Sequence, residues 1–439
     1  MRFPQIFPQH GLGGSTDLPI PFTYTVVAAA WALSFSFVIL IFAWRTPRLR
    51  ADSPGWPLPS WVNAVATSQA VRRVLAGLGL AFTVWVAVAG IFGPAKSSQN
   101  ALPATFYVLL WVGLVALSLI FGPVWKLISP VRALHPGEKG RANYPERWGY
   151  WPGVAGLFAF AWMELASPDP GSVRALVIWC SVYLVVTVLG AVVYGRRWCE
   201  RGDPFEVYST LVSHLSAVGP GAARGTYVLR NPLSNLQAVD VRAGSVALTA
   251  TLLGSTAFDS FSARPGWQRW VDATAHSALE ATAIRTVGLL AMIAMVGGSF
   301  WLATRAVPGL DAAQRRALPG LLSPSLVPIV VGYVFAHYIS YLLEKGQSAV
   351  KLLLDPLGRG WNPMGLAHSD VDYVLSTHPT LLAVLKVLFV LAGHVLGVMA
   401  AHDRSLRVLP DRHQLTGQLP LLMVMVLYTC GGLFLLFGG

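Results

Sequence analysis

Five side chains that can bind a proton or a ligand lie within or beside long apolar segments of this sequence. Glu164 and Asp259 are carboxylic acids near the ends of two such segments. His337, Tyr341 and Glu344 follow at i, i+4 and i+7, a spacing that places them on one face of a helix. Ionisable groups cost free energy in apolar surroundings unless they are paired or hydrated, so each is a candidate functional residue. Such a group could bind a divalent metal, relay protons or recognise a cationic solute.

A second interpretation treats some of these groups as interfacial residues that are hydrated or cap a helix end. We favour it for Glu344 and for the loop that follows, because charge near a membrane surface costs little. Glu164 and His337 lie at least one turn deeper, and for them neither interpretation is preferred. The loop residues concerned are His368, Asp370, Asp372 and His378.

His394 stands near the middle of another apolar segment, between Gly393 and Gly397. This GxxxG spacing lets a second helix approach closely. The imidazole then either forms a hydrogen bond between helices, which we favour, or provides an intramembrane proton or ligand site. His337 and His394 differ by about 12 Å in expected depth at the helical rise per residue, which argues against a haem held between them.

Membrane-spanning helices must position these residues. Of the 439 residues, 54% are hydrophobic and only 12% charged, and the mean hydropathy is +0.56. Apolar runs of about 20 residues match the thickness of a bilayer core. We therefore predict an all-α, polytopic transmembrane helix bundle that forms a single integral membrane domain over residues 1–439. The ten predicted spans are 22–44, 74–93, 104–128, 150–166, 173–194, 243–258, 281–303, 320–343, 380–402 and 417–437.

The distribution of Lys and Arg predicts the orientation of these spans. Sixteen basic residues follow spans one, three and five, against three in the other connections of the first half, which places the N-terminus outside. In the second half, six basic residues lie in the connections of one side and six in those of the other. The rule applies best to short loops, and the connections predicted to be inside are the short ones, which places the C-terminus outside as well. The segment 242–258 is short, and the alternative is that it is re-entrant or interfacial.

Two interfacial helices are predicted on the cytoplasmic side, after spans three and five. Each begins with a capping residue followed by proline, Ser129-Pro130 in one and Asp203-Pro204 in the other. Asp203 and Glu206 also have the spacing of a capping box. Apolar residues along 205–215 form a stripe that suits a membrane surface.

Several kinds of site are absent from the sequence. Basic residues flank the apolar runs, so we predict that they interact with the lipid bilayer. We do not predict nucleic acid as a partner. Cys180, Cys199 and Cys430 lack metal-ligand spacing, and neither a GxxxxGK[ST] loop nor an HExxH motif occurs. No cofactor is predicted, and a divalent metal held by the carboxylates and histidines stays an alternative.

Several stretches resemble a family of bacterial polytopic membrane proteins labelled fenitrothion hydrolase. They are His10 to Pro21, Trp198 to Tyr208, Ser255 to Ser262, Asp355 to Trp361 and Gly393 to Arg404. The label implies cleavage of an organophosphorus ester, but the resemblance carries over no set of catalytic residues.

Three functions fit this sequence. The first, which we favour, is a transporter or permease of the cytoplasmic (inner) membrane for a small-molecule or ion solute. The second is a non-catalytic membrane subunit bound to protein partners. The third is a membrane-embedded, metal-dependent hydrolase of organophosphorus esters, as the resemblance implies. For the transporter we expect an outward-facing polar cavity lined by Glu164, Asp259, His337, Tyr341 and Glu344.

Overall fold

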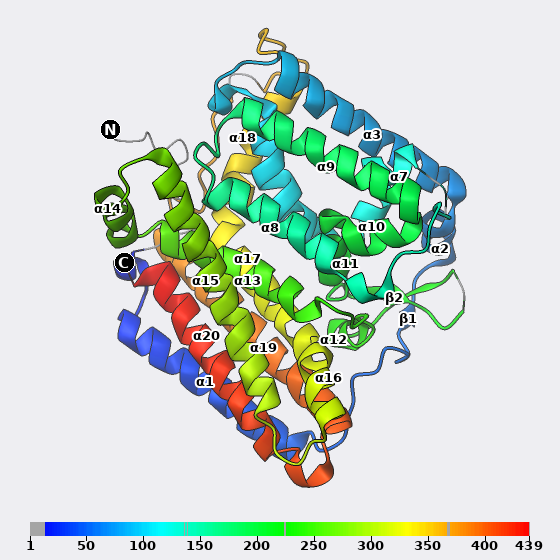
Figure 1. The fold of residues 1–439 in the computed structure, drawn as a ribbon, viewed down its shortest axis with the longest axis vertical. Helices are drawn as coiled ribbons and strands as arrows, with labels where there is room; N and C mark the ends of the chain where they lie inside the picture. Colours follow the sequence, from blue (N-terminus) through cyan, green and yellow to red (C-terminus); the bar gives the residue numbers. More distant parts are fainter. Residues whose placement is uncertain (1–13, 136, 138, 224, 367–368, 439) are drawn as a thin grey trace.

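The computed structural model describes residues 14–135, 137, 139–223, 225–366 and 369–438. In these residues the chain is mainly helical, and its strands are three short segments in the connections (Figure 1). The prediction of an all-α bundle is confirmed.

Within the described residues, eight helices are long and apolar enough to cross a membrane. They agree with eight of the ten predicted spans, and α9 agrees at both ends. The eight are α1 (Phe22–Ala43), α3 (Gln69–Phe92), Ala101–Phe121 (α4, η3 and α5), α9 (Val173–Tyr194), α15 (Ala278–Arg305), Ala312–Leu354 (α16 to α18), α19 (Pro379–Val408) and Thr416–Phe437, which contains α20 (Leu419–Phe437).

The other two predicted spans are also helices, but shorter ones. α8 (Trp151–Leu165) is about 22 Å long and α13 (Ser245–Ser262) about 27 Å at the usual rise. α13 is buried along most of its length against α8, α15 and α17. Since protein surrounds it, α13 tolerates many Ser and Thr side chains that a lipid-facing helix would not. Membrane crossing by α8 and α13 stays a prediction.

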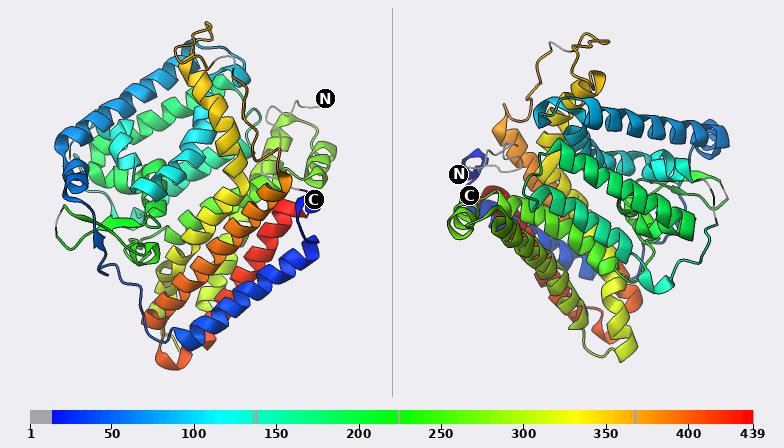
Figure 2. Two further views of the ribbon diagram at one scale, coloured as in Figure 1. Left: turned by 180° about the vertical axis from the view of Figure 1, so that it is seen from behind. Right: turned by 45° about the horizontal axis from the view of Figure 1, so that its top comes forward.

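The helices form two packed groups (Figure 1). One contains α1, α13, α15, α17 (Val327–Ser340), α19 and α20, and the other contains α3, α8 and α9 with the shorter helices between them. Seen from behind, α1 lies along the edge of the first group beside α20 (Figure 2). The rings of Phe22 and Phe434 are 6.5 Å apart, so the start of α1 and the end of α20 lie at the same end of the bundle. The side of the membrane that they face stays a prediction.

Helices α17 and α19 touch at glycines. A Cβ atom on Gly393 would lie 2.7 Å from the Pro328 carbonyl oxygen, and one on Gly397 would lie 2.9 Å from that of Ser325. Both distances are shorter than van der Waals contact. The close approach expected from the GxxxG spacing is therefore present, with α17 as the partner helix.

Short helices follow α5 (Leu114–Phe121) and α9, with the predicted caps. Ser129 caps α7 (Pro130–Leu134), and Asp203 caps α11 (Pro204–Ser213) by accepting from the N–H groups of Phe205 and Glu206. α11 differs from the prediction in position, because it is buried against α5, α8 and α10 (Arg196–Gly202) instead of lying on a membrane surface. The capping box is also incomplete, since the Glu206 carboxylate binds Arg132.

The connections that carry the basic residues meet in a small antiparallel sheet of order β1-β3-β2. Its strands are β1 (Trp56–Pro57), β2 (Val218–Pro220) and β3 (Tyr227–Leu229). The sheet joins the segment after α1 to the segment after α9, so these two basic connections lie on the same side of the molecule. The remaining elements are η1 (Ser15–Asp17), α2 (Ser60–Thr67), η2 (Ser97–Gln99), α4 (Ala101–Ala104), η3 (Thr105–Gly113), α6 (Trp125–Ile128), η4 (Glu146–Trp148), α12 (Pro232–Leu236), α14 (Pro265–Thr274), α16 (Ala312–Leu322), η5 (Ser323–Leu326), η6 (Tyr341–Lys345), α18 (Gly346–Leu354), η7 (Asp411–His413) and η8 (Thr416–Gln418).

Candidate functional site

Polar side chains from two neighbouring helices meet inside the bundle. α13 supplies Asp259 and Ser260 from its last turn, and α17 supplies Tyr333, His337 and Tyr338. Tyr333 and His337 stand at i and i+4 and so share one face of α17. α13 and α17 are in direct contact. We call these five residues the Asp259 network.

His337 is at the centre of the Asp259 network. Its Nε2 lies 2.9 Å from Asp259 Oδ2, and its Nδ1 lies 3.0 Å from Ser260 Oγ. The Tyr338 hydroxyl donates to the same Asp259 oxygen at 2.6 Å, and the hydroxyl oxygens of Ser260 and Tyr333 are 3.1 Å apart. Both ring nitrogens of His337 are therefore engaged, which holds the imidazole in one orientation.

Burial restricts the protons that the Asp259 network can hold. Ser260 and His337 are fully buried, and Asp259 is only 9% exposed. With a neutral imidazole, Nε2–H donates to the Asp259 carboxylate and Nδ1 accepts from Ser260, whose oxygen accepts from Tyr333. Every donor in this arrangement points toward Asp259. The Ser260 hydroxyl has a second acceptor on its own helix, the Thr256 carbonyl oxygen at 3.4 Å.

Glu164 is a second carboxylic acid beside the network. It lies in the last turn of α8, within electrostatic range of Asp259 and of the hydroxyl of Tyr341. Two residues earlier, the Trp162 indole donates to Thr286 Oγ1 at 2.8 Å. Thr286 is about 12 Å along α15 from its start at the helical rise per residue, so this level is within the apolar part of the bundle.

Tyr341 and Glu344 both lie in the π-helical segment η6, but their side chains contact different parts of the protein. Tyr341 is buried near Tyr338, with a ring separation of 6.3 Å. Glu344 instead accepts from the backbone N–H and the hydroxyl of Ser376, at 2.8 and 2.6 Å. The Glu344 carboxylate thus anchors the loop before α19. Because Glu344 is buried, hydrogen bonds from Ser376 replace the hydration or helix capping that the interfacial interpretation expected.

The loop before α19 adds no side chain to the network among the described residues. Asp370, Asp372 and His378 are exposed, and His378 Nδ1 bonds the Val374 carbonyl oxygen at 2.8 Å. His368 lies outside the described residues. In the described part of the chain, no three His, Cys, Asp or Glu side chains come together as a metal site. We therefore assign no metal ligands, and the divalent metal stays an untested alternative.

His394 is buried in α19 apart from the Asp259 network. Its Nδ1 lies 2.8 Å from the Val390 carbonyl oxygen of its own helix, and no partner for its buried Nε2 is found among the described residues. The hydrogen bond between helices that we favoured from the sequence is thus replaced, in the described contacts, by one within α19. The proton-site interpretation stays a prediction.

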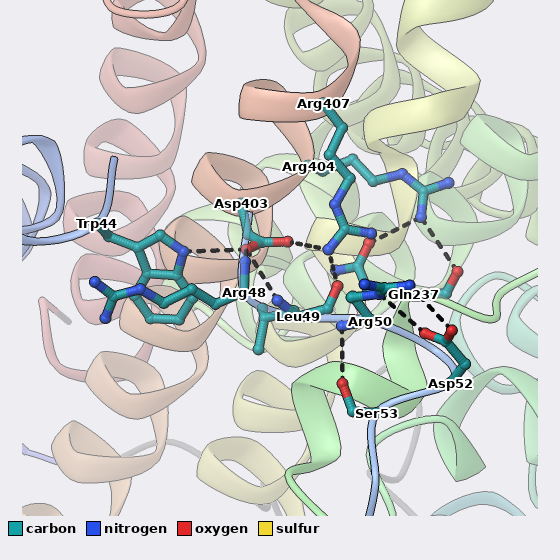
Figure 3. A network of polar contacts seen from close by, with 10 residues as sticks. All are labelled: Trp44, Arg48, Leu49, Arg50, Asp52, Ser53, Gln237, Asp403, Arg404 and Arg407. Atoms are coloured by element: carbon teal, nitrogen blue, oxygen red, sulfur yellow. Dashed lines mark hydrogen bonds and ion pairs between the residues drawn. The ribbon is translucent and has the colours of Figure 1, made fainter. Parts of the chain in front are cut away.

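One buried charged group escaped the sequence analysis. Asp403, near the end of α19, accepts from the Trp44 indole at 3.1 Å and from the backbone N–H groups of Arg48 and Leu49 at 2.5 and 3.1 Å (Figure 3). Arg407 donates to its other oxygen at 2.8 Å. Asp403 therefore ties the segment after α1 to α19. Its main partners are backbone groups about 350 positions away, which no local pattern reveals.

A second buried charged group joins the helices that follow α5 and α9. Arg132 makes two hydrogen bonds with Glu206, at 2.7 and 2.6 Å. Asp203 accepts from the Trp125 indole and the Tyr183 hydroxyl at 3.0 Å each. Burial, followed by the Glu206 carboxylate, raises the pKa of Asp203 to about 7, although its hydrogen bonds favour the ionised form. From the sequence, Asp203 and Glu206 were recognised only as helix-capping residues.

Comparisons with protein families, curated proteins and solved structures found no match for this chain. The resemblance to the fenitrothion hydrolase family stays a prediction. Function must therefore be inferred from the chemistry of the site.

Proposed function

We propose that this membrane protein is a proton-coupled transporter of a small cationic solute, with the Asp259 network as its coupling site. The observation that carries the proposal is the Asp259–His337 pair, buried inside the helix bundle and extended by Ser260 and Tyr333. Ionisable pairs are expensive within membrane helices and mark ion pathways and proton relays. Glu164 adds a second acid, which suits a cationic solute better than an anionic one.

The proposed cycle follows from the hydrogen bonds. With neutral His337, the Asp259 carboxylate keeps its negative charge and can attract a cation from the outer end of the bundle. When His337 is protonated, its positive charge neutralises Asp259, and the attraction for the cation is lost. Protonation and cation binding are then mutually exclusive, which is the thermodynamic requirement for exchange of one for the other.

Proteoliposomes containing the full chain and the pH dye pyranine test this proposal. We expect at least one of choline, tetraethylammonium, L-arginine, Na⁺ or K⁺ to drive a proton flux in the wild type. His337→Gln and Asp259→Asn should abolish the flux, since an amide keeps hydrogen-bonding capacity but carries no proton. Asp52→Asn, which changes an exposed carboxylate of a basic connection, is the matched control. Absence of flux with every cation, from folded wild-type protein, would refute the proposal.

A second candidate function is a hydrolase with a serine nucleophile. Ser260, His337 and Asp259 are hydrogen-bonded in the order of a Ser-His-Asp triad, with distances of 3.0 and 2.9 Å. In that role Ser260 Oγ would attack phosphorus in an organophosphorus ester while its proton passes to His337, and the alcohol would leave with that proton. Ser260 is fully buried and its oxygen also contacts Tyr333, so we rank transport first.

A fluorophosphonate probe separates the two candidates. A serine hydrolase would be labelled at Ser260, and Ser260→Ala would lose both the label and all activity. In the transporter, Ser260→Ala removes one link of the network but leaves the Asp259–His337 pair, so we expect slower flux without labelling. Labelling of wild-type Ser260 together with an absence of flux would replace the first proposal by the second.

We also propose that the start of α1 and the end of α20 face the outside of the cytoplasmic membrane, with the basic connections inside. Single cysteines in a cysteine-free chain test this orientation. Cysteines at the exposed positions Ser60 and Arg412 should react only after permeabilisation, and those at the exposed positions Ser98 and Thr274 should react in intact cells. The reverse pattern would overturn the orientation. Because Asp403 binds the segment after α1, Ser60 and Arg412 should also behave alike, and reaction of only one of them in intact cells would contradict the packing of α1 against α19.

A further inference from the structure

A cavity of about 650 Å³ lies at the end of the bundle that carries the basic connections. It is enclosed by α6, α10, α11 and the first turn of α13, where Ser245 and Thr249 face it. Asp259 follows Thr249 by ten residues on α13, about 15 Å along the helix. The cavity is therefore distinct from the Asp259 network. Six basic side chains line it: Lys126, Lys139, Arg196, Arg197, Arg201 and Arg242.

Carboxylates balance only part of this positive charge. Glu200 and Asp240 line the cavity and pair with Arg196 and Arg242 at 2.8 and 2.5 Å. Glu146 is 2.8 Å from both Arg201 and Arg242 and 3.9 Å from Arg197. Among the described residues, three carboxylates thus face six cations, which leaves an excess of positive charge in a partly enclosed space. Such an excess attracts anions, and the low dielectric of the walls strengthens the attraction.

Lys126 is the more buried of the two cavity lysines, since Lys139 is exposed. It is half-buried, and no ion pair or hydrogen bond of its ammonium group is found among the described residues. Burial lowers its pKa. The acid that acts on it most strongly is Glu206, whose two oxygens are already bonded to Arg132. A half-buried ammonium group without a partner is costly, and a bound anion would remove that cost.

The rest of the wall supplies weaker polar groups and an apolar surface. The Thr210 hydroxyl is buried without a hydrogen-bond partner among the described residues, and His214 uses Nδ1 to bond the Thr210 carbonyl oxygen at 2.7 Å. Val207, Leu211 and Leu248 provide the apolar part. A ligand that suits this wall carries a compact negative group beside an uncharged portion.

We infer that this cavity binds a phosphate-bearing anion, held by Lys126 and by Arg197. The ion pair of Arg197 with Glu146 is long, at 3.9 Å, whereas its neighbours Arg196 and Arg201 on α10 are closely paired at 2.8 Å. Arginine and lysine form short, charge-assisted hydrogen bonds with phosphate oxygens. Two sources share this chemistry, namely the headgroup of an anionic phospholipid and a soluble phosphate compound. Basic pockets at the cytoplasmic ends of membrane helices are suited to the first source.

Titration of the full chain in dodecyl maltoside tests the inference. The probes are dioleoyl-phosphatidylglycerol in mixed micelles, with dioleoyl-phosphatidylcholine as the uncharged comparison, and glycerol 3-phosphate as the soluble anion. The readouts are the melting temperature followed by tryptophan fluorescence and the bound mass in native mass spectrometry. We expect saturable binding of phosphatidylglycerol or glycerol 3-phosphate, and an affinity about tenfold lower in Lys126→Gln and in Arg197→Gln, the loss of one charged hydrogen bond.

The controls separate the cavity from general surface charge. Arg73→Gln removes an exposed positive charge near the start of α3, outside the cavity, and should leave the affinity unchanged. Without ligand, Lys126→Gln should melt no lower than the wild type, because it removes an uncompensated charge. Binding of the lipid alone identifies a headgroup site, and binding of glycerol 3-phosphate identifies a soluble ligand. No saturable binding of either, or equal weakening by Arg73→Gln, would overturn the inference.

Discussion

Asp403 should be the most sensitive carboxylate of the basic end of the bundle. In Asp403→Asn, the amide oxygen can keep the bonds from Trp44 and from the backbone of residues 48 and 49, but the amide nitrogen then faces Arg407. The variant loses one charge-assisted hydrogen bond, worth about 1.5–3 kcal/mol, and brings two donors together. Since Asp403 is fully buried, water cannot replace the lost acceptor. We expect the free energy of unfolding to fall by about 2–4 kcal/mol.

Unfolding by SDS in dodecyl maltoside micelles, followed by tryptophan fluorescence, measures this change. Asp52→Asn is the matched control, because Asp52 lies on the same connection but is exposed and pairs only with exposed Arg50 (Figure 3). We expect no measurable change for it. Combining Asp403→Asn with Arg407→Gln should cost less than the sum of the two single changes, since both remove the same bond.

Trypsin provides a second readout, because the connection after α1 contains Arg45, Arg48 and Arg50. Loss of the Asp403 anchor should expose this segment and speed its cleavage. If Asp403→Asn and Asp52→Asn unfold at the same SDS concentration and are cleaved at the same rate, Asp403 does not hold the connection to α19.

Three further predictions concern the helix contact, the isolated histidine and the buried acid. Gly393→Ala should lower the free energy of unfolding by about 1–3 kcal/mol, because its Cβ would meet the Pro328 carbonyl oxygen, whereas Gly431→Ala, with open space around it, should be neutral in the same SDS titration. His394→Leu should melt at or above the wild-type temperature, because it removes a buried nitrogen without a partner among the described residues, and a clear drop would reveal an interaction of that nitrogen. The raised pKa of Asp203 means that, between about pH 4 and 7, the folded protein holds a proton that the unfolded chain has released, so the free energy of unfolding should fall as the pH rises through that window. Asp203→Asn should flatten this part of the stability–pH curve. An unchanged slope would contradict the raised pKa of Asp203.

The sequence by itself determined the class of the fold and the positions of its long helices. A helix that contacts lipid must be apolar for about 20 residues, so the length of each apolar run marks the element directly. This logic predicted both ends of α9 correctly, and α9 is exposed over much of its surface. It is weakest for α13, which protein surrounds and which therefore needs no uniform apolar surface. Local chemistry was equally readable, since the Asp203 cap depends only on the residues that follow it.

Only the tertiary structure decided which ionisable groups act together. The sequence grouped Glu344 with His337 because both lie on one helix, yet the Glu344 carboxylate binds Ser376 and the His337 imidazole binds Asp259. It also placed the helix of residues 204–213 on a membrane surface, whereas helices from both halves of the chain bury it. Spacing along one helix specifies a face but not the partner that the face meets. That partner depends on how helices distant in the sequence pack, which is a property of the whole bundle and not of any segment.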